Sequence, residues 1–251
     1  MRASFNPAPL KRKLQNRAQG FSRDLGEELR RVGRVVAVSL ATSAQPYGIG
    51  EYSRRSGEIA TARDIRRCYA TPGQVYKAFD DKFKAGSFWK AIKAADYSRA
   101  QQIMRKYCPR FATKELKPFD GGAAHKAARN ARGRVSSSQE PAFVVQTTRD
   151  LEAYIKSEVY RVGEGKAGWA SCAKILGGTR GLPQWVTRHA GKIAPGSVVQ
   201  SKSSIVLRNE VPYAENILQP AAKAEAVRIG IDRLTKQAII AERRAARANA
   251  L

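Results

Sequence analysis

The chain has 251 residues, of which 43% are hydrophobic and 27% charged, so it is long enough to bury a sizeable core and is not a wholly disordered chain. Its charge balance is unusual, because 46 Lys and Arg residues face 21 Asp and Glu residues and leave a net charge of +25. Such an excess repels copies of the same molecule unless a polyanion or an acidic protein surface neutralises it.

The cysteines and the distribution of apolar residues further limit the class of protein to which the chain can belong. Cys68, Cys108 and Cys172 are far apart in the sequence, which argues against a disulfide framework and fits a reducing cytoplasm. The N-terminus lacks the apolar segment of a secretory signal, and no run approaches the ~20 apolar residues that span a bilayer. We therefore expect a soluble protein with no membrane association.

The chain is expected to begin with a basic arm and a long helix. Residues 1–19 contain two prolines and the basic side chains of Lys11, Arg12 and Lys13. Ser22 then provides a helix N-cap, and apolar residues recur at helical spacing at Leu25, Leu29, Val32, Val36 and Leu40. The helix should end before the stretch AQPYGIG, where a proline and two glycines interrupt the pattern.

Short helices are expected over the rest of a helical part that covers residues 20–111. In ATPGQVYKAF, Thr71 is a candidate N-cap, Pro72 lies at the first helical position and Gln74 completes a capping box. Phe79, Phe83 and Phe88 follow at helical spacing among lysines. That spacing favours a core position over a surface for base stacking. Cys108 and Pro109 end this part.

Residues 112–141 predict an extended basic loop. They have almost no large apolar side chains, and they contain Gly-Gly and three consecutive serines. Loops of this length inside a compact domain are uncommon and are often functional. We expect it to lie on a partner through Arg129, Arg132 and Arg134.

The remaining residues, 142–251, are expected to form an α+β part in one domain with residues 20–50. Phe143 to Val145 suit a strand, a helix follows, and GEGKAGWASCAKILGG continues or restarts it. A turn surrounds Trp185, and SVVQSKSSIVL supplies one or two strands. From Pro220 a long helix is expected to present one apolar face and to end in a cationic tail; the face comprises Val227, Ile231, Leu234 and Ala238.

The predicted fold class is therefore a helix-rich α+β protein. It has a long N-terminal helix, a long C-terminal helix, an extended basic arm and loop, and a small, mostly antiparallel sheet formed mainly by residues 140–211.

We expect no catalytic residue, no metal site and no cofactor, and hence no enzyme. Neither His125 nor His189 has metal-ligand spacing with a cysteine. Cys172 with His189 could form a nucleophile pair, but AGWASCAKI is more typical of a helix that buries a small thiol. GEGKAG and LGGTRG lack the residue order of a phosphate-binding loop, so glycine-rich turns are the better interpretation.

The basic residues leave two interpretations open. The loop arginines, together with Arg243, Arg244 and Arg247 in the tail, could neutralise phosphates without sequence specificity. No recognition helix or finger motif is present for sequence-specific DNA binding. A solvated or partner-facing surface is the more common role of such charge runs.

Two stretches carry a resemblance to known proteins. The order of an N-terminal helix, an AQPYG break, strands, a strand that ends in VPYAENIL and an alanine-rich terminal helix resembles the head–tail connector and tail-completion proteins of tailed bacteriophages. The matching corner residues are Tyr213, Ala214, Ile217 and Leu218. A second stretch resembles phage virion structural proteins through Lys166, Gly168, Trp169, Gly181, Pro183 and Trp185.

The resemblance implies a structural virion protein of the neck or tail, assembled in the host cytoplasm as a ring of six or twelve copies. Its partners would be portal, adaptor or tail proteins with acidic surfaces, or passing DNA. The arm with Lys11, Arg12 and Lys13, the basic loop and the C-terminal tail would contact them. Candidate subunit-interface residues are Pro212, Tyr213, Ile217, Leu218 and Trp185. Pro212 fixes the angle at which the strand turns into the helix, and Tyr213 suits either an interface or the core. The alternative function is a non-specific nucleic-acid-binding protein of packaging or nucleoprotein type.

Overall fold

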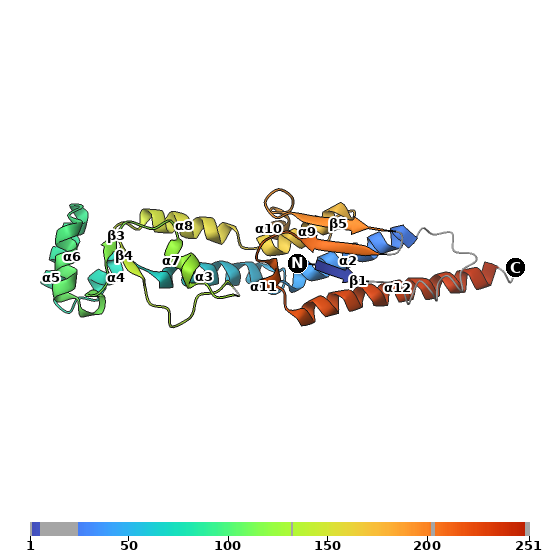
Figure 1. The fold of residues 1–251 in the computed structure, drawn as a ribbon, viewed down its shortest axis with the longest axis horizontal. Helices are drawn as coiled ribbons and strands as arrows, with labels where there is room; N and C mark the ends of the chain where they lie inside the picture. Colours follow the sequence, from blue (N-terminus) through green and yellow to red (C-terminus); the bar gives the residue numbers. More distant parts are fainter. Residues whose placement is uncertain (1, 6–24, 132, 202–203, 249–251) are drawn as a thin grey trace. The chain divides into compact units, whose positions relative to one another are not determined.

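A computed structural model describes residues 2–5, 25–131, 133–201 and 204–248. The chain divides into two compact units (Figure 1). Unit 1 comprises Met1–Arg55 and Gly163–Leu251, and unit 2 comprises Ser56–Val162. Unit 2 is thus inserted into the sequence of unit 1. The predicted helix-rich α+β class is confirmed.

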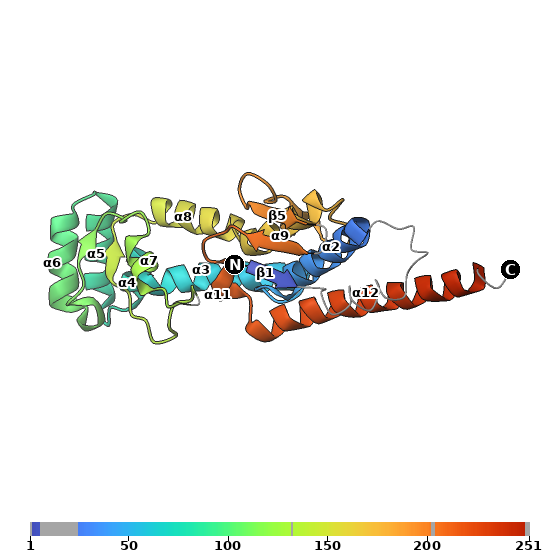
Figure 2. The same ribbon diagram turned by 45° about the vertical axis from the view of Figure 1, so that its right-hand side comes forward.

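Unit 1 contains an antiparallel sheet and helices that pack on it. Its elements are β1 (Arg2–Phe5), α2 (Leu25–Ser43), α9 (Glu164–Ile175), α10 (Gln184–Thr187), β5 (Gly196–Gln200), β6 (Ile205–Asn209), α11 (Ala214–Ile217) and α12 (Pro220–Ala248). The strand order is β1-β6-β5, and both neighbours run antiparallel to β6. Helices α2 and α9 pack on each other and on β6 (Figure 2).

The core of unit 1 follows from alternation along β6. Ile205, Leu207 and Asn209 are buried, while the residues between them are half-buried. Ile205 and Leu207 pack with Leu29 and Val36 of α2 and with α9. The apolar spacing that predicted α2 therefore covers one face of the sheet.

Helix α12 begins at Pro220 as expected, but its buried face is rotated from the predicted one. The buried residues are Ala226, Gly230 and Leu234, whereas Ile231 is 44% exposed. A Cβ atom at Gly230 would lie 2.7 Å from Val36 Cγ2. Small residues allow α12 to approach α2 closely, so the bulky Ile231 lies outside the contact.

Unit 2 is built from short elements. They are most of α3 (Glu51–Cys68), β2 (Tyr69–Ala70), α4 (Pro72–Lys77), α5 (Lys82–Lys93), α6 (Tyr97–Tyr107), the 3-10 helix η1 (Pro109–Phe111), β3 (Leu116–Lys117), α7 (Ala123–Ala128), β4 (Phe143–Val145) and α8 (Arg149–Tyr160). The predicted capping box of α4 is present, since Thr71 accepts from the Gln74 N–H and Gln74 bonds back to the Thr71 backbone.

A second sheet, which the sequence did not predict, lies in unit 2. Strands β2, β4 and β3 form it in that order, and both pairings are parallel. We expected residues 140–211 to build one sheet and residues 142–251 to build one part of the fold. Because β4 pairs with β2 and β3 and not with β5 or β6, residues 142–162 belong to unit 2.

The stretch 112–141, expected as an extended loop, contains β3, α7 and a closed turn. Its Gly-Gly pair has a packing role. Gly122 has a φ of +91°, and a Cβ atom there would lie 2.4 Å from the ring of Tyr154. Leu116, His125 and Val135 are buried, so this stretch is part of the body of unit 2.

Candidate functional site

Two segments of the phage-like order, AQPYG and VPYAENIL, meet in unit 1. The backbone N–H of Gln45, in AQPYG, donates to the carbonyl oxygen of Ile217, in VPYAENIL, at 3.1 Å. The side-chain amide of Gln219 donates to the hydroxyl of Tyr47 at 2.8 Å. The break after α2 therefore holds the corner that leads from β6 to α12.

The GEGKAG stretch packs against the same corner. The hydroxyl of Tyr213 donates to the Glu164 carboxylate at 2.9 Å. A Cβ atom at Gly165 would lie 2.0 Å from Ile217 Cδ1, and one at Gly168 would lie 2.0 Å from Asn209 Oδ1. The glycines that superficially suggested a phosphate loop thus make room for neighbouring side chains.

Lys166 ties α9 to the end of α2. Its side chain is fully buried, and Nζ donates to the carbonyl oxygens of Ala41 at 2.8 Å, Thr42 at 3.1 Å and Ala44 at 2.5 Å. Burial lowers the pKa of Lys166 to about 7. The charged form of Lys166 has three N–H donors for these three acceptors and complements the negative C-terminal end of a helix, so these hydrogen bonds favour it against the effect of burial. We name this arrangement the lysine clamp: Lys166 with the three carbonyls.

The expected interface residues pack mostly within unit 1. Leu218 and Trp185 are buried, and Trp185 Nε1 donates to the carbonyl of Ile49 at 3.0 Å. Tyr213 and Ile217 are half-buried, and only Pro212 of the five is exposed. These side chains therefore fix the corner, and little of their surface faces outward.

The sulfur of Cys172 is in a structural position. It lies 3.2 Å from the carbonyl oxygen of Arg208, and burial raises the pKa of its thiol to about 12. The thiol is therefore protonated at neutral pH.

Among the described residues, no group of three or more His, Cys, Asp or Glu side chains could hold a metal ion. None of the described helices combines the length and the hydropathy that a membrane span requires.

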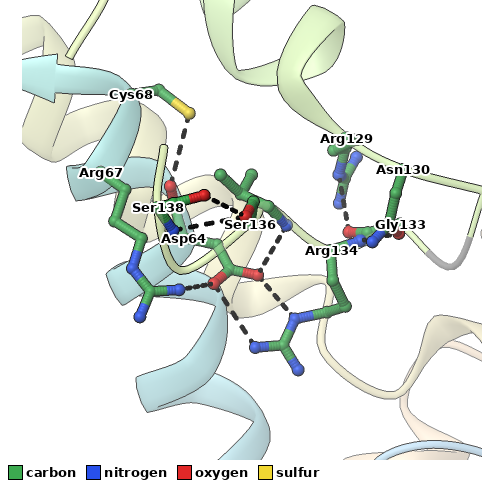
Figure 3. A network of polar contacts seen from close by, with 10 residues as sticks. Asp64, Arg67, Cys68, Arg129, Asn130, Gly133, Arg134, Ser136 and Ser138 are labelled. Atoms are coloured by element: carbon green, nitrogen blue, oxygen red, sulfur yellow. Dashed lines mark hydrogen bonds and ion pairs between the residues drawn. The ribbon is translucent and has the colours of Figure 1, made fainter. Parts of the chain in front are cut away.

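In unit 2 two of the loop arginines, Arg129 and Arg134, are engaged in local contacts (Figure 3). Arg134 Nε lies 2.6 Å from a carboxylate oxygen of Asp64, which is buried and also accepts from Arg67 and from the backbone N–H of Val135. Arg129 is exposed, and its Nε donates to the carbonyl of Gly133 at 3.2 Å. Arg134 therefore anchors the turn to α3 and is not a free cation.

The other predicted contact residues are only partly described. Arg243 is exposed on α12. Lys11, Arg12, Lys13 and Arg132 lie outside the described residues, and so do the side chains of Arg244 and Arg247.

A further basic surface, which the sequence pattern did not single out, lies on α4, α5, α6 and η1. We call residues 72–111 the cationic hairpin. Its nine basic residues are Lys77, Lys82, Lys84, Lys90, Lys93, Arg99, Arg105, Lys106 and Arg110. Lys84 is half-buried and the others are exposed.

Phe83 on this hairpin corrects a sequence expectation. Phe79 and Phe88 are buried as predicted, but Phe83 is 76% exposed. Helix α4 ends at Lys77 and Asp81 caps a new helix, so Phe79 and Phe83 do not share one helical face. The Asp81 cap is the sequence signal that could have revealed this break.

Comparisons of the chain with protein-family models, curated proteins and solved structures found no match.

Proposed function

We propose that this protein is a structural subunit of a tailed-phage virion, a head–tail connector or tail-completion protein that assembles with its own copies into a ring in the neck or tail. The observation that carries the proposal is the contact between AQPYG and VPYAENIL, made through Gln45 and Ile217. The corner residues of VPYAENIL, which carry the resemblance, lie where β6 leads into α12, and this contact helps to hold them in place. A ring subunit needs such fixed geometry because every copy must repeat the same contacts.

The edge of the sheet in unit 1 offers a surface for a neighbouring copy. Among the described strands, β5 pairs with β6 alone. The free edge of a strand can pair with another chain. Val199 on β5 is 54% exposed and the nearby Ile193 is 57% exposed, so apolar surface accompanies that edge.

The net charge of +25 supports partners of opposite sign. A ring multiplies this charge, and acidic surfaces of portal, adaptor or tail proteins, or DNA, would neutralise it. Contacts of this kind should weaken as the salt concentration rises.

Light scattering on the purified chain, alone and with the acidic proteins of its virion, tests the proposal. We expect a closed oligomer in at least one of these conditions, and we expect Val199→Lys to reduce assembly without unfolding the monomer. Ile239→Lys, at a 43% exposed position on α12, serves as the matched control. A monomer under all conditions, together with particles that join heads to tails without this protein, would contradict the proposal.

A further inference from the structure

We propose that the cationic hairpin of unit 2 binds single-stranded nucleic acid. Phe83 and Tyr107 would provide the stacking surface, and the surrounding Lys and Arg side chains would contact phosphates. The inference concerns unit 2 alone and does not depend on the assembly role proposed for unit 1.

The charge of the hairpin is locally unbalanced. Residues 72–111 contain nine basic residues and three acidic ones, Asp80, Asp81 and Asp96. Two of the three cap helices: Asp81 accepts from the N–H groups of Phe83 and Lys84, and Asp96 accepts from that of Arg99. In the described part of the chain, ion pairs of Lys and Arg with acidic side chains involve residues outside this hairpin. The nine cations are therefore available to a polyanion.

The aromatic rings lie among these cations. Helices α5 and α6 pack on each other (Figure 1), and the start of α5 lies beside the end of α6. Lys84 Nζ is 4.8 Å from the ring centroid of Tyr107 and 5.5 Å from that of Phe83, and Lys106 Nζ is 5.2 Å from that of Tyr107. Because these ammonium groups lie over the ring faces, a base that stacks on a covered face takes the place of a lysine, whose flexible side chain can then contact the phosphate.

The exposed ring of Phe83 favours nucleic acid over an acidic protein. The negative face of a phenyl ring does not attract a carboxylate, whereas each base stacked on an aromatic side chain contributes about 1–3 kcal/mol to single-strand binding. In a duplex the bases already stack on one another, so the rings discriminate in favour of unpaired bases. The combination of cations and exposed aromatics is typical of sequence-tolerant single-strand binding.

The exposed residues of the cationic hairpin lie on helices whose other faces form a packed core. They can therefore be substituted without disturbing that core. Phe88, Ala100 and Met104 are buried between the helices, while Phe83 projects to solvent. Substitution of Phe83 should therefore leave the fold intact.

The first experiment measures binding of a fluorescent oligothymidine of about 20 nucleotides to the full chain by anisotropy. We expect Phe83→Ala to weaken binding roughly fivefold to a hundredfold and to remove the preference for the oligothymidine over a duplex of equal length. Tyr52→Ala, which removes an 86% exposed ring outside the hairpin, should leave the affinity unchanged. Equal loss in the two variants would overturn the proposal.

The second experiment measures the salt dependence. Each lysine that contacts phosphate contributes about 0.7 to the slope of log affinity against log salt for a single strand. We expect Lys84→Gln and Lys106→Gln each to reduce the slope by about that amount, whereas Lys156→Gln, an exposed lysine on α8, should not. If poly-glutamate of matched charge binds as tightly as the oligothymidine and Phe83→Ala affects neither ligand, the surface serves an acidic protein and the proposal is wrong.

Discussion

Unit 1 and the cationic hairpin of unit 2 use polar side chains in opposite ways. Unit 1 buries them against its own backbone: Lys166 bonds three carbonyls, Asn209 donates to the Gly165 carbonyl at 2.7 Å, and Ser171 donates to the Ala194 carbonyl at 2.6 Å. On the cationic hairpin of unit 2, acidic side chains cap helices and basic ones face solvent.

This difference separates structural residues from candidate binding residues. A lysine between glycines in unit 1 looks like a ligand-binding loop in the sequence, yet its neighbours occupy every donor. A lysine beside an exposed phenylalanine in unit 2 looks like ordinary helix surface, yet its charge is uncompensated nearby. Mutation of the buried polar residues of unit 1 should therefore affect stability, whereas mutation of the exposed residues of the cationic hairpin should affect binding.

The largest expected effect is on the lysine clamp. Lys166→Met should lower the free energy of unfolding of unit 1 by about 3 kcal/mol or more, because three buried carbonyl oxygens lose their donor. The loss would be measured by hydrogen exchange of peptides from α2 and α9 at increasing concentrations of denaturant.

Lys174→Met on the same helix is the matched control, since Lys174 is exposed. It should change stability by no more than about 0.5 kcal/mol. If both variants lose the same free energy of unfolding, the hydrogen bonds of the lysine clamp contribute no stability, and the loss comes only from removing a positive charge from α9.

Two glycine substitutions, one in each unit, should change stability in opposite directions. Gly168→Ala should destabilise unit 1 by about 3 kcal/mol, because the new methyl group would overlap the side chain of Asn209. Gly86→Ala on α5 should stabilise unit 2 by about 1 kcal/mol, since no atom lies within 4 Å of the new Cβ atom. Thermal unfolding should give shifts of opposite sign in the two variants, and a stabilising or negligible shift in Gly168→Ala would show that the close packing around Gly168 is unimportant.

Asp64 in unit 2 should have a somewhat smaller effect. Asp64→Asn removes the carboxylate that accepts from Arg134 and Arg67, and we expect a loss of about 2 kcal/mol because the carboxylate is buried while the Arg134 side chain is 49% exposed. Hydrogen exchange should accelerate in the turn at residues 129–135. Glu140→Gln, which removes an 81% exposed carboxylate paired with Lys114, should have almost no effect; a similar loss there would argue against a special role for Asp64.

Local signals in the sequence predicted the helices well and the contacts between elements poorly. The capping box at Thr71 and the start of α12 at Pro220 depend on residues a few positions apart, so sequence patterns capture them. The buried face of α12 depends on Gly230 meeting Val36 of a distant helix, and periodicity alone favoured Ile231 instead. The pairing of β4 with two short parallel strands likewise depends on long-range contacts that hydrophobic alternation does not encode.

The sequence was similarly limited in predicting which basic surfaces are free to bind a partner. Charge counts pointed to the loop and the tail, but Arg134 is paired with Asp64. The sequence cannot show which cations find an acidic partner, because those partners are often distant along the chain. The exposure of Phe83 was not predicted because the helical spacing of apolar residues was continued from α4 into α5. The chain breaks between these two helices, so the spacing does not apply across them.

The smallest expected effect is a change in the stability of unit 2 with pH. His125 is 1% exposed, and its Nδ1 lies 3.0 Å from the hydroxyl of Tyr154. Burial, and after it the charge of Arg129, lowers the pKa of His125 below its usual value of 6.5; Lys126 acts in the same direction, while Glu158 and Asp64 oppose it.

Because the folded state disfavours the proton, the unfolded chain binds more protons below pH 6.5. The contribution of His125 to stability is therefore fully present above that pH and is lost progressively as the pH falls toward the pKa of the folded state. We expect unit 2 to lose about 1 kcal/mol between pH 7.5 and pH 5.5, measured by hydrogen exchange of its peptides. His125→Gln should flatten this dependence, whereas His189→Gln in unit 1 should not. An unchanged slope in His125→Gln would mean that another group titrates, and the packing of His125 under Tyr154 would then tolerate its charged form.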